Sequence, residues 1–112
     1  MNKVDSAIRN AEKAVKLDEN SWSGYRNLVV YYTEKGEYKK AKIYIRRAAE
    51  INDSLLSETE FMLASAVSYI KIGDLKTAEA VLTILLERQP EIKGDEQFVA
   101  IVRHLKANMA DQ

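Results

Sequence analysis

The sequence predicts an all-α fold made of helical hairpins that repeat along the chain. Apolar residues recur every three or four positions through most of the 112 residues, which is the spacing of one helix face. No segment alternates with the period of two that a strand would show. Two helical patterns meet at Gly36, and the same arrangement returns at Gly73, 37 residues later. Such a hairpin cannot bury its apolar face alone and must stack on a copy of itself.

The first expected helix lies within residues 1–18 and has a narrow stripe of small apolar side chains. The stripe consists of Val4, Ala7, Ile8, Ala11, Ala14 and Val15. The polar run Asp18-Glu19-Asn20-Ser21 then interrupts the pattern. Asn20 or Ser21 can cap the next helix by accepting hydrogen bonds from its free backbone N–H groups.

The first complete hairpin is expected over residues 22–55. Its first helix places one set of apolar residues on one side, namely Trp22, Tyr25, Leu28, Val29 and Tyr32. We expect this helix to end at Gly36, because glycine adopts the left-handed conformation of a helix end at little cost. The second helix carries its apolar side chains inward and ends near Asn52-Asp53; these are Tyr38, Ala41, Ile45, Ala48 and Ala49.

The second complete hairpin is expected over residues 59–92. Ser57-Glu58-Thr59-Glu60 has the pattern of a capping box, in which Ser57 accepts from the N–H three residues on and Glu60 reaches back. The hairpin turns at Gly73 and stops before Pro90, which cannot continue a helix. Asp95 is expected to cap a last helix over 95–110, whose apolar residues are Phe98, Ile101, Val102, Leu105 and Met109.

Composition excludes several classes of function. The 17 basic and 17 acidic residues cancel, so no overall field would draw the chain to nucleic acid or to an anionic membrane. Cysteine is absent and His104 stands alone, so we expect no metal and no cofactor. Without a run of about 18 apolar residues or a secretory signal, we expect a soluble, cytoplasmic protein. A domain cut from an exported or membrane-anchored parent would look the same.

The sequence gives little support for catalysis or for phosphate binding. Catalysis needs a nucleophile beside a base, or two converging carboxylates, whereas the carboxylates here are scattered over helix surfaces. No Gly-rich phosphate loop is present, so we expect no enzyme activity. Lys39, Lys42 and Arg46 share one side of a helix and could contact phosphates. Because Glu37 and Glu50 dilute that charge, we interpret them as a solvated outer face.

When the two glycines are aligned, the flanking helices superimpose. Tyr25-x2-Leu28-Val29-x2-Tyr32 falls on Met62-x2-Ser65-Ala66-x2-Tyr69, and Ala41-x3-Ile45 falls on Ala78-x3-Leu82. These spacings resemble the tetratricopeptide repeat family over most of the chain. The resemblance implies a right-handed α-solenoid of antiparallel helical hairpins with about six helices. It also implies a non-enzymatic scaffold for protein–protein interaction.

We therefore expect one tetratricopeptide-like domain over residues 1–112. It divides into a half-repeat helix (1–18), two repeats (22–55 and 59–92) and a capping helix or half-repeat (95–110). The sequence departs from the family pattern, since Val29 and Ala66 stand where glycine is usual and Asp53 where proline is usual. Either the array once extended before Met1, which we favour, or a lone first helix shields the first hairpin.

In this family the first helix of each hairpin lines a concave groove that holds peptides or helices of partner proteins. Carried over to this sequence, the groove positions are Arg26, Val30, Thr33, Leu63, Val67, Ile70, Val99, Arg103 and Lys106. The centre of this groove would be apolar and its edges basic. A carboxylate clamp is not expected, because Arg26 and Val30 stand where it would need lysine and asparagine. The row instead suits a protein or peptide with apolar anchors.

A second hypothesis is a self-associating structural module. The last helix or a second copy of the chain could cover the apolar groove, and open repeat ends could stack on another chain. Homo-oligomerisation would then occur through the groove or the repeat ends. Neither hypothesis involves nucleic acid or a membrane. The sequence does not identify the partner, the pathway or the oligomeric state.

Overall fold

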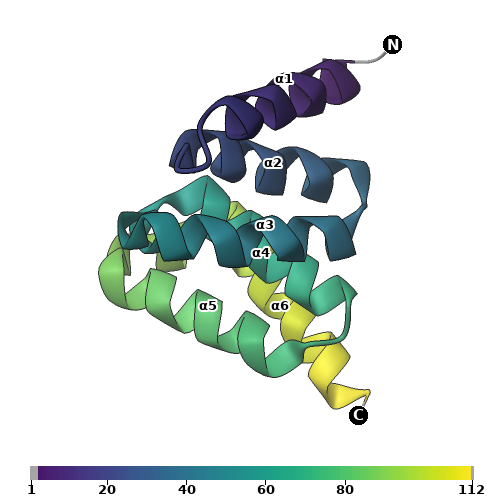
Figure 1. Cartoon of the computed structure of the whole chain (residues 1–112). Helices are drawn as coiled ribbons and strands as arrows, with labels where there is room; N and C mark the ends of the chain where they lie inside the picture. Colours follow the sequence, from purple (N-terminus) through teal and green to yellow (C-terminus); the bar gives the residue numbers. More distant parts are fainter. Residues whose placement is uncertain (1–2, 112) are drawn as a thin grey trace.

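The computed structural model describes residues 3–111, and these form a stack of antiparallel helices (Figure 1). The elements are α1 (Lys3–Leu17), α2 (Trp22–Lys35), α3 (Tyr38–Ile51), the 3-10 helix η1 (Asp53–Ser57), α4 (Thr59–Lys71), α5 (Leu75–Arg88), the 3-10 helix η2 (Pro90–Gly94) and α6 (Glu96–Ala110). The part of the chain described contains no strand. The expected all-helical hairpin repeat is confirmed.

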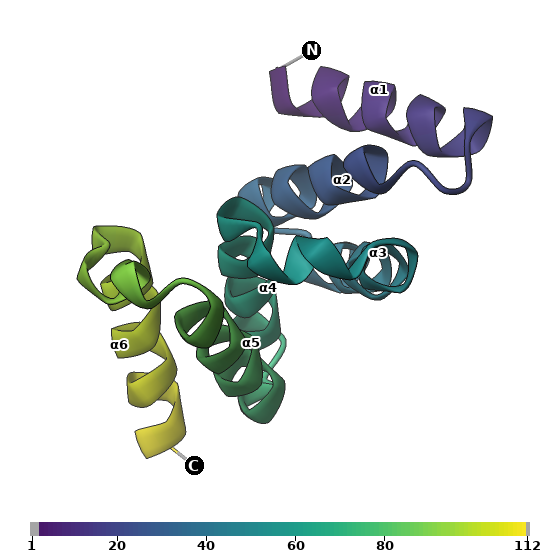
Figure 2. The same cartoon turned by 90° about the vertical axis from the view of Figure 1, so that its left-hand side faces the viewer.

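Successive hairpins stack through their first helices. Helix α4 packs on both helices of the first hairpin, α2 and α3, and α6 in turn packs on both helices of the second, α4 and α5. Figure 2 shows α4 lying between α2 and α6. This order is that of a solenoid, in which each unit is buried by its neighbours.

The two aligned glycines end the first helices as expected. Gly36 has φ 82° and Gly73 has φ 88°, the left-handed conformation that side chains with a Cβ disfavour. After Gly36 the backbone N–H of Glu37 donates to the carbonyl of Tyr32 at 2.9 Å. After Gly73 the backbone N–H of Asp74 donates to the carbonyl of Tyr69, also at 2.9 Å. These bonds satisfy carbonyls that the helix end leaves free. The turn chemistry therefore repeats with the sequence.

The caps of α2 and α6 are those expected, but the cap of α4 is not. Ser21 accepts from the N–H of Gly24, and Asp95 accepts from that of Phe98 at 3.0 Å. The predicted capping box at Ser57 is wrong: Glu58 is the cap, and its carboxylate accepts from the N–H of Phe61 at 2.6 Å.

The reason for that difference lies in η1. Leu55 is buried, and the 3-10 turn around it takes in Ser57 as its last residue. The backbone becomes extended only at Glu58, so the helix begins one residue later than the sequence pattern suggested. Glu60, expected to reach back to the cap, instead forms an ion pair with Arg26.

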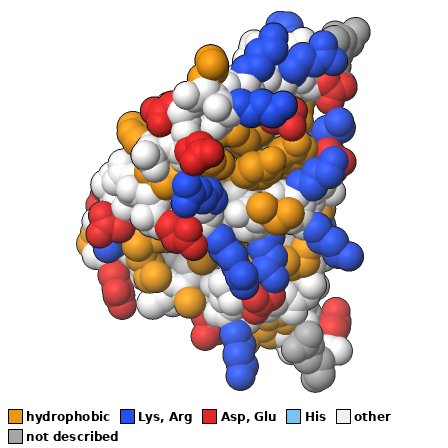
Figure 3. Space-filling model, in the orientation of Figure 1, with side chains coloured by type: hydrophobic (Ala, Val, Ile, Leu, Met, Phe, Trp, Pro, Cys, Tyr) orange, Lys and Arg blue, Asp and Glu red, His pale blue; other side chains and the backbone are white. Residues whose placement is uncertain are grey.

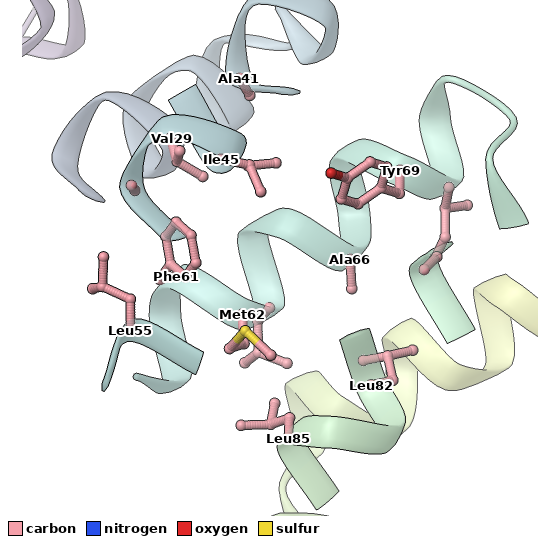
Figure 4. Packing of buried hydrophobic residues seen from close by; sticks show 14 of the residues in the cluster. Val29, Ala41, Ile45, Leu55, Phe61, Met62, Ala66, Tyr69, Leu82 and Leu85 are labelled. Carbon is pink, nitrogen blue, oxygen red and sulfur yellow. The ribbon is translucent and has the colours of Figure 1, made fainter. Parts of the chain in front are cut away.

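The core is continuous through the stack and is centred on α4, which buries residues on opposite sides. Figure 4 shows Phe61 and Tyr69 of α4 on the side of Val29 and Ile45. Small residues stand where helices approach closely, and these have no exposed surface: Ala41, Ala48, Ala66 and Ala78. A larger side chain at any of these four positions would hold the helices apart.

The first helix is packed on one side only. Ile8 and Ala11 are its buried residues, whereas Leu17 is 89% exposed. Residues 1–2 of the expected half-repeat (1–18) lie outside the described residues, as does residue 112 of the expected domain (1–112). The division of the chain into a half-repeat, two repeats and a final helix stays a prediction.

Candidate functional site

An open cleft of about 460 Å³ lies between α2, α4 and α6. Its lining residues come from all three helices and are Val30, Thr33, Glu34, Glu60, Leu63, Ala64, Val67, Gln97, Ala100 and Ile101. Four of the groove positions expected from the sequence are among them: Val30, Thr33, Leu63 and Val67. These four lie on α2 and α4, so the first helices of the two hairpins meet at this cleft.

The apolar centre of the cleft is less accessible than expected. Leu63 is 6% exposed, and Ile70 is 3% exposed and is not part of the lining. Helix α6 packs against α4 and fills part of the space that an open groove would leave. The apolar surface open to a partner is therefore smaller than a full row of Leu63, Val67 and Ile70.

The charge at the edge of the cleft is acidic where a basic edge was expected. The Arg26 guanidinium lies 3.0 Å from a Glu58 carboxylate oxygen and 3.2 Å from one of Glu60. Its charge is thus more than matched by two carboxylates of its own chain. Glu34, also at the cleft, is exposed and makes no ion pair within residues 3–111. Arg26, which was expected to contribute to a basic edge, is paired within the protein.

Thr33 connects the two hairpins beside the cleft. Its hydroxyl donates to the backbone carbonyl of Val29 at 2.7 Å and lies 2.9 Å from the Ser68 hydroxyl on α4. Ser68 is fully buried. The polar group of Thr33 is therefore used within the protein, and only its methyl group is left to contact a partner.

The third set of expected groove residues does not line the cleft. The lining residues on α6 are Gln97, Ala100 and Ile101, whereas Val99 and Arg103 are absent and Lys106 lies at a separate hollow. The expected positions Val99, Arg103 and Lys106 each stand 36 residues after Leu63, Val67 and Ile70. The glycine spacing of 37, applied to the lining residues Glu60, Leu63 and Ala64, gives 97, 100 and 101. A one-residue error turned the expected positions by about 100° around the helix.

A family model of the tetratricopeptide repeat matches residues 24–54. Residues 24–54 therefore form a tetratricopeptide repeat. The match covers α2 and α3 almost completely, the helices whose spacing first indicated the family. A comparison with curated proteins found no match. Tetratricopeptide repeats generally mediate protein–protein interactions and are typically non-enzymatic modules.

In residues 3–111, no group of three or more His, Cys, Asp or Glu side chains could hold a metal ion. None of the helices described is long and apolar enough to cross a bilayer.

Sequence reasoning missed one set of residues at the cleft, which consists of Glu34, Glu60, Ala64, Gln97, Ala100 and Ile101. Part of this set could have been found from the sequence. Adding the 37-residue spacing of the two glycines to the expected groove position Leu63 would have given Ala100, one of the three lining positions on α6. The spacing does not find Glu34 or Glu60. The pairing of Glu60 with Arg26 joins residues far apart in the sequence.

Proposed function

We propose that this protein is a non-enzymatic scaffold that binds a segment of a partner protein in the cleft between α2, α4 and α6. The observation that carries this proposal is the meeting of α2, α4 and α6 around one open hollow with an apolar floor. Its volume lies in the range of about 300–1,000 Å³ typical of binding sites. A cleft of this size holds a few anchoring side chains of a peptide or helix.

The occupant we propose is a segment with apolar anchors and flanking basic residues. Val30, Val67 and Ile101 offer apolar surface that a partner can cover. At the edge of the cleft, the three negative charges of Glu34, Glu58 and Glu60 outweigh the one positive charge of Arg26. Complementary charge steers encounter and fixes orientation more than it adds affinity. Association should therefore slow as salt rises.

The cleft is held in shape before a partner arrives. Arg26 joins α2 to the cap of α4 through Glu58, and Thr33 joins α2 to α4 through Ser68. A site with fixed walls loses little conformational entropy on binding, so more of the apolar contact is realised as affinity.

The test selects binders from a displayed peptide library with the purified protein and measures their affinity for variants. Val67→Glu and Ala100→Glu should each weaken the selected peptides by about tenfold or more, because each places a charge on the apolar floor. Ile43→Glu is the matched control, since Ile43 is 65% exposed on α3 and away from the cleft. Leu63→Glu is unsuitable because the buried charge would unfold the hairpin.

The binding measurements give different results if the cleft is the site and if it is not. Selected peptides enriched in basic residues, weakened by both cleft variants and unaffected by Ile43→Glu, would support the proposal. Glu34→Lys should reduce the preference for basic peptides without unfolding the protein, because Glu34 is exposed. A library that yields no binder, or peptides that bind Ala100→Glu as tightly as the wild type, would show that the cleft is not the site.

A further inference from the structure

A second hollow, of about 180 Å³, lies between α5 and α6. We call it the C-terminal face; its lining includes Glu79, Leu86, Phe98, Val102, Lys106 and Met109. It lies on a different side of α6 from the cleft, which uses Gln97, Ala100 and Ile101. An occupant of the C-terminal face would therefore leave the partner-binding cleft open.

Large apolar side chains are exposed on both helices of this face. Leu86 on α5 is 37% exposed, and Met109 on α6 is 44% exposed. Between them lie Phe98 and Val102, which are more deeply placed. An exposed apolar patch on a folded protein generally marks an interaction surface.

The opposite end of the stack has different chemistry. Helix α1 exposes four basic side chains, Lys3, Arg9, Lys13 and Lys16. The space-filling view shows Lys and Arg gathered over this helix at the top of the molecule (Figure 3). Covering these charges with an apolar face would cost free energy without any compensating pair. Stacking the C-terminal face of one copy on α1 of the next is therefore disfavoured.

The charged residues of the C-terminal face are instead complementary to the same face of a second copy. Glu79 and Lys106 line the same hollow, one on each helix, and neither makes an ion pair within residues 3–111. A two-fold axis parallel to the helices places α5 of one copy against α6 of the other. Glu79 stands near the start of α5 and Lys106 near the end of α6, and both line the same end of the hollow. In this arrangement Glu79 meets Lys106 of the partner subunit, and the two-fold axis makes the contact twice.

We propose that the C-terminal face is a homodimer interface, in which α5 and α6 of two copies pack across a two-fold axis. The apolar centre supplies the free energy of association. The two Glu79–Lys106 pairs at its edge fix the register. The two partner-binding clefts of the dimer stay open.

The test measures the molar mass of the full chain by sedimentation equilibrium over a wide concentration range. The wild type should pass from monomer to dimer as concentration rises. Leu86→Glu and Met109→Glu should each raise the dissociation constant by about tenfold or more, because both copies carry the charge. Ile43→Glu, an equally drastic change at an exposed apolar residue of α3, should leave it unchanged. Circular dichroism checks that every variant is folded.

Charge exchange tests the two-fold arrangement itself. Glu79→Lys and Lys106→Glu should each weaken the dimer severalfold, since like charges then face each other at both contacts. The double variant E79K/K106E should regain the wild-type affinity. An equimolar mixture of the two single variants should form heterodimers, because every contact in them joins opposite charges.

Several results would overturn the proposal. A wild type that stays monomeric up to millimolar concentration would show that the face is not a homodimer interface. A dimer that Leu86→Glu and Met109→Glu leave intact would place the interface elsewhere. Failure of both the double variant and the mixture to restore association would rule out the two-fold pairing of Glu79 with Lys106. Unchanged peptide binding by Met109→Glu would separate this result from the function of the cleft.

Discussion

The hydroxyl of Ser68 on α4 donates a hydrogen bond to the hydroxyl of Thr33 on α2, with 2.9 Å between the oxygens. The direction follows from the other bond that Thr33 makes. Its one hydroxyl hydrogen goes to the carbonyl of Val29 at 2.7 Å, so Thr33 can only accept from Ser68. Ser68 is fully buried and cannot turn to solvent instead. This pair of hydroxyls links the first two hairpins beside the cleft, in addition to the pairing of Arg26 with Glu58.

This direction predicts unequal costs for removing the two hydroxyls. Thr33→Val keeps the shape of the side chain but leaves the buried Ser68 hydroxyl without its acceptor, which should cost about 1–3 kcal/mol of unfolding free energy. Ser68→Ala removes the donor while Thr33 keeps its bond to Val29, and should cost only about 1 kcal/mol. Urea denaturation measures both. In the double variant the costs should be smaller than their sum, since no hydroxyl is left unpaired.

The cap of α4 gives a second prediction. Glu58→Ala should lower the unfolding free energy by about 1–2 kcal/mol, because the N–H of Phe61 loses its acceptor and Arg26 loses one carboxylate. Ser57→Ala should change it by a few tenths at most, since its hydroxyl contacts only the exposed Arg88 side chain. Glu58→Ser separates the two roles, because serine can cap the helix but cannot pair with Arg26. A larger cost at Ser57 than at Glu58 in thermal unfolding would contradict the structure.

The first two hairpins could be predicted from the sequence because each carries its own marker. Gly36 and Gly73 set the helix ends and the 37-residue register, so the groove positions carried over from the family gave Val30, Thr33, Leu63 and Val67 on α2 and α4 correctly as cleft residues. Helix α6 has no glycine turn after it in the described residues, and its register was inferred from apolar residues alone. Apolar spacing tolerates a one-residue shift, which is enough to move a side chain off the cleft.

Long-range contacts explain most of what the sequence did not show. Leu55 is buried in a 3-10 turn too short to have a periodicity, so the start of α4 was misplaced. The pairing of Arg26 with Glu58 joins residues 32 apart in sequence. Because of this pairing the edge of the cleft is acidic where a basic edge was expected, and no local sequence pattern indicates the pairing.

Gly24 gives a third prediction, on the packing of α1 against α2. A Cβ built at Gly24 would lie 2.8 Å from Cγ1 of Val15 and 3.4 Å from Cβ of Ala14. Alanine favours a helix over glycine by about 1 kcal/mol. Overpacking a tight contact costs about 1–3 kcal/mol, however, and Val15 is branched and cannot fold away. Gly24→Ala should therefore lower the melting temperature.

The neighbouring position supplies the control for this substitution. Ser23→Ala, on the exposed side of the same helix turn, should leave the melting temperature unchanged or raise it slightly. Adding Val15→Ala to Gly24→Ala should recover part of the loss by making room for the new methyl group. A Gly24→Ala variant more stable than the wild type would mean that α1 shifts freely on α2.

Asp74, the cap of α5, predicts a dependence of stability on pH. The hydroxyl of Thr77 donates to the Asp74 carboxylate at 2.8 Å, and the backbone N–H of Thr77 donates to the same carboxylate at 3.3 Å. The pKa of Asp74 is held below its ordinary value of 3.8 mainly by the hydrogen bond from the Thr77 hydroxyl. The backbone hydrogen bond and the charges of Lys42 and Arg46 lower the pKa further. A carboxyl group with a lowered pKa stabilises the folded state at neutral pH. That contribution is lost as the pH falls below about 4 and through the folded pKa.

Asp74→Asn isolates this contribution. Asparagine is also a good cap but does not titrate, so the variant should be less stable than the wild type at pH 7 and equally stable near pH 2. The other carboxylates titrate in both proteins and cancel in the difference. Carbon NMR of the Asp74 carboxyl group should give a midpoint below 3.8, and Thr77→Val should raise that midpoint by removing the strongest donor. A midpoint at or above 3.8, or a difference in stability that is constant with pH, would show that Thr77 does not hold the charged form.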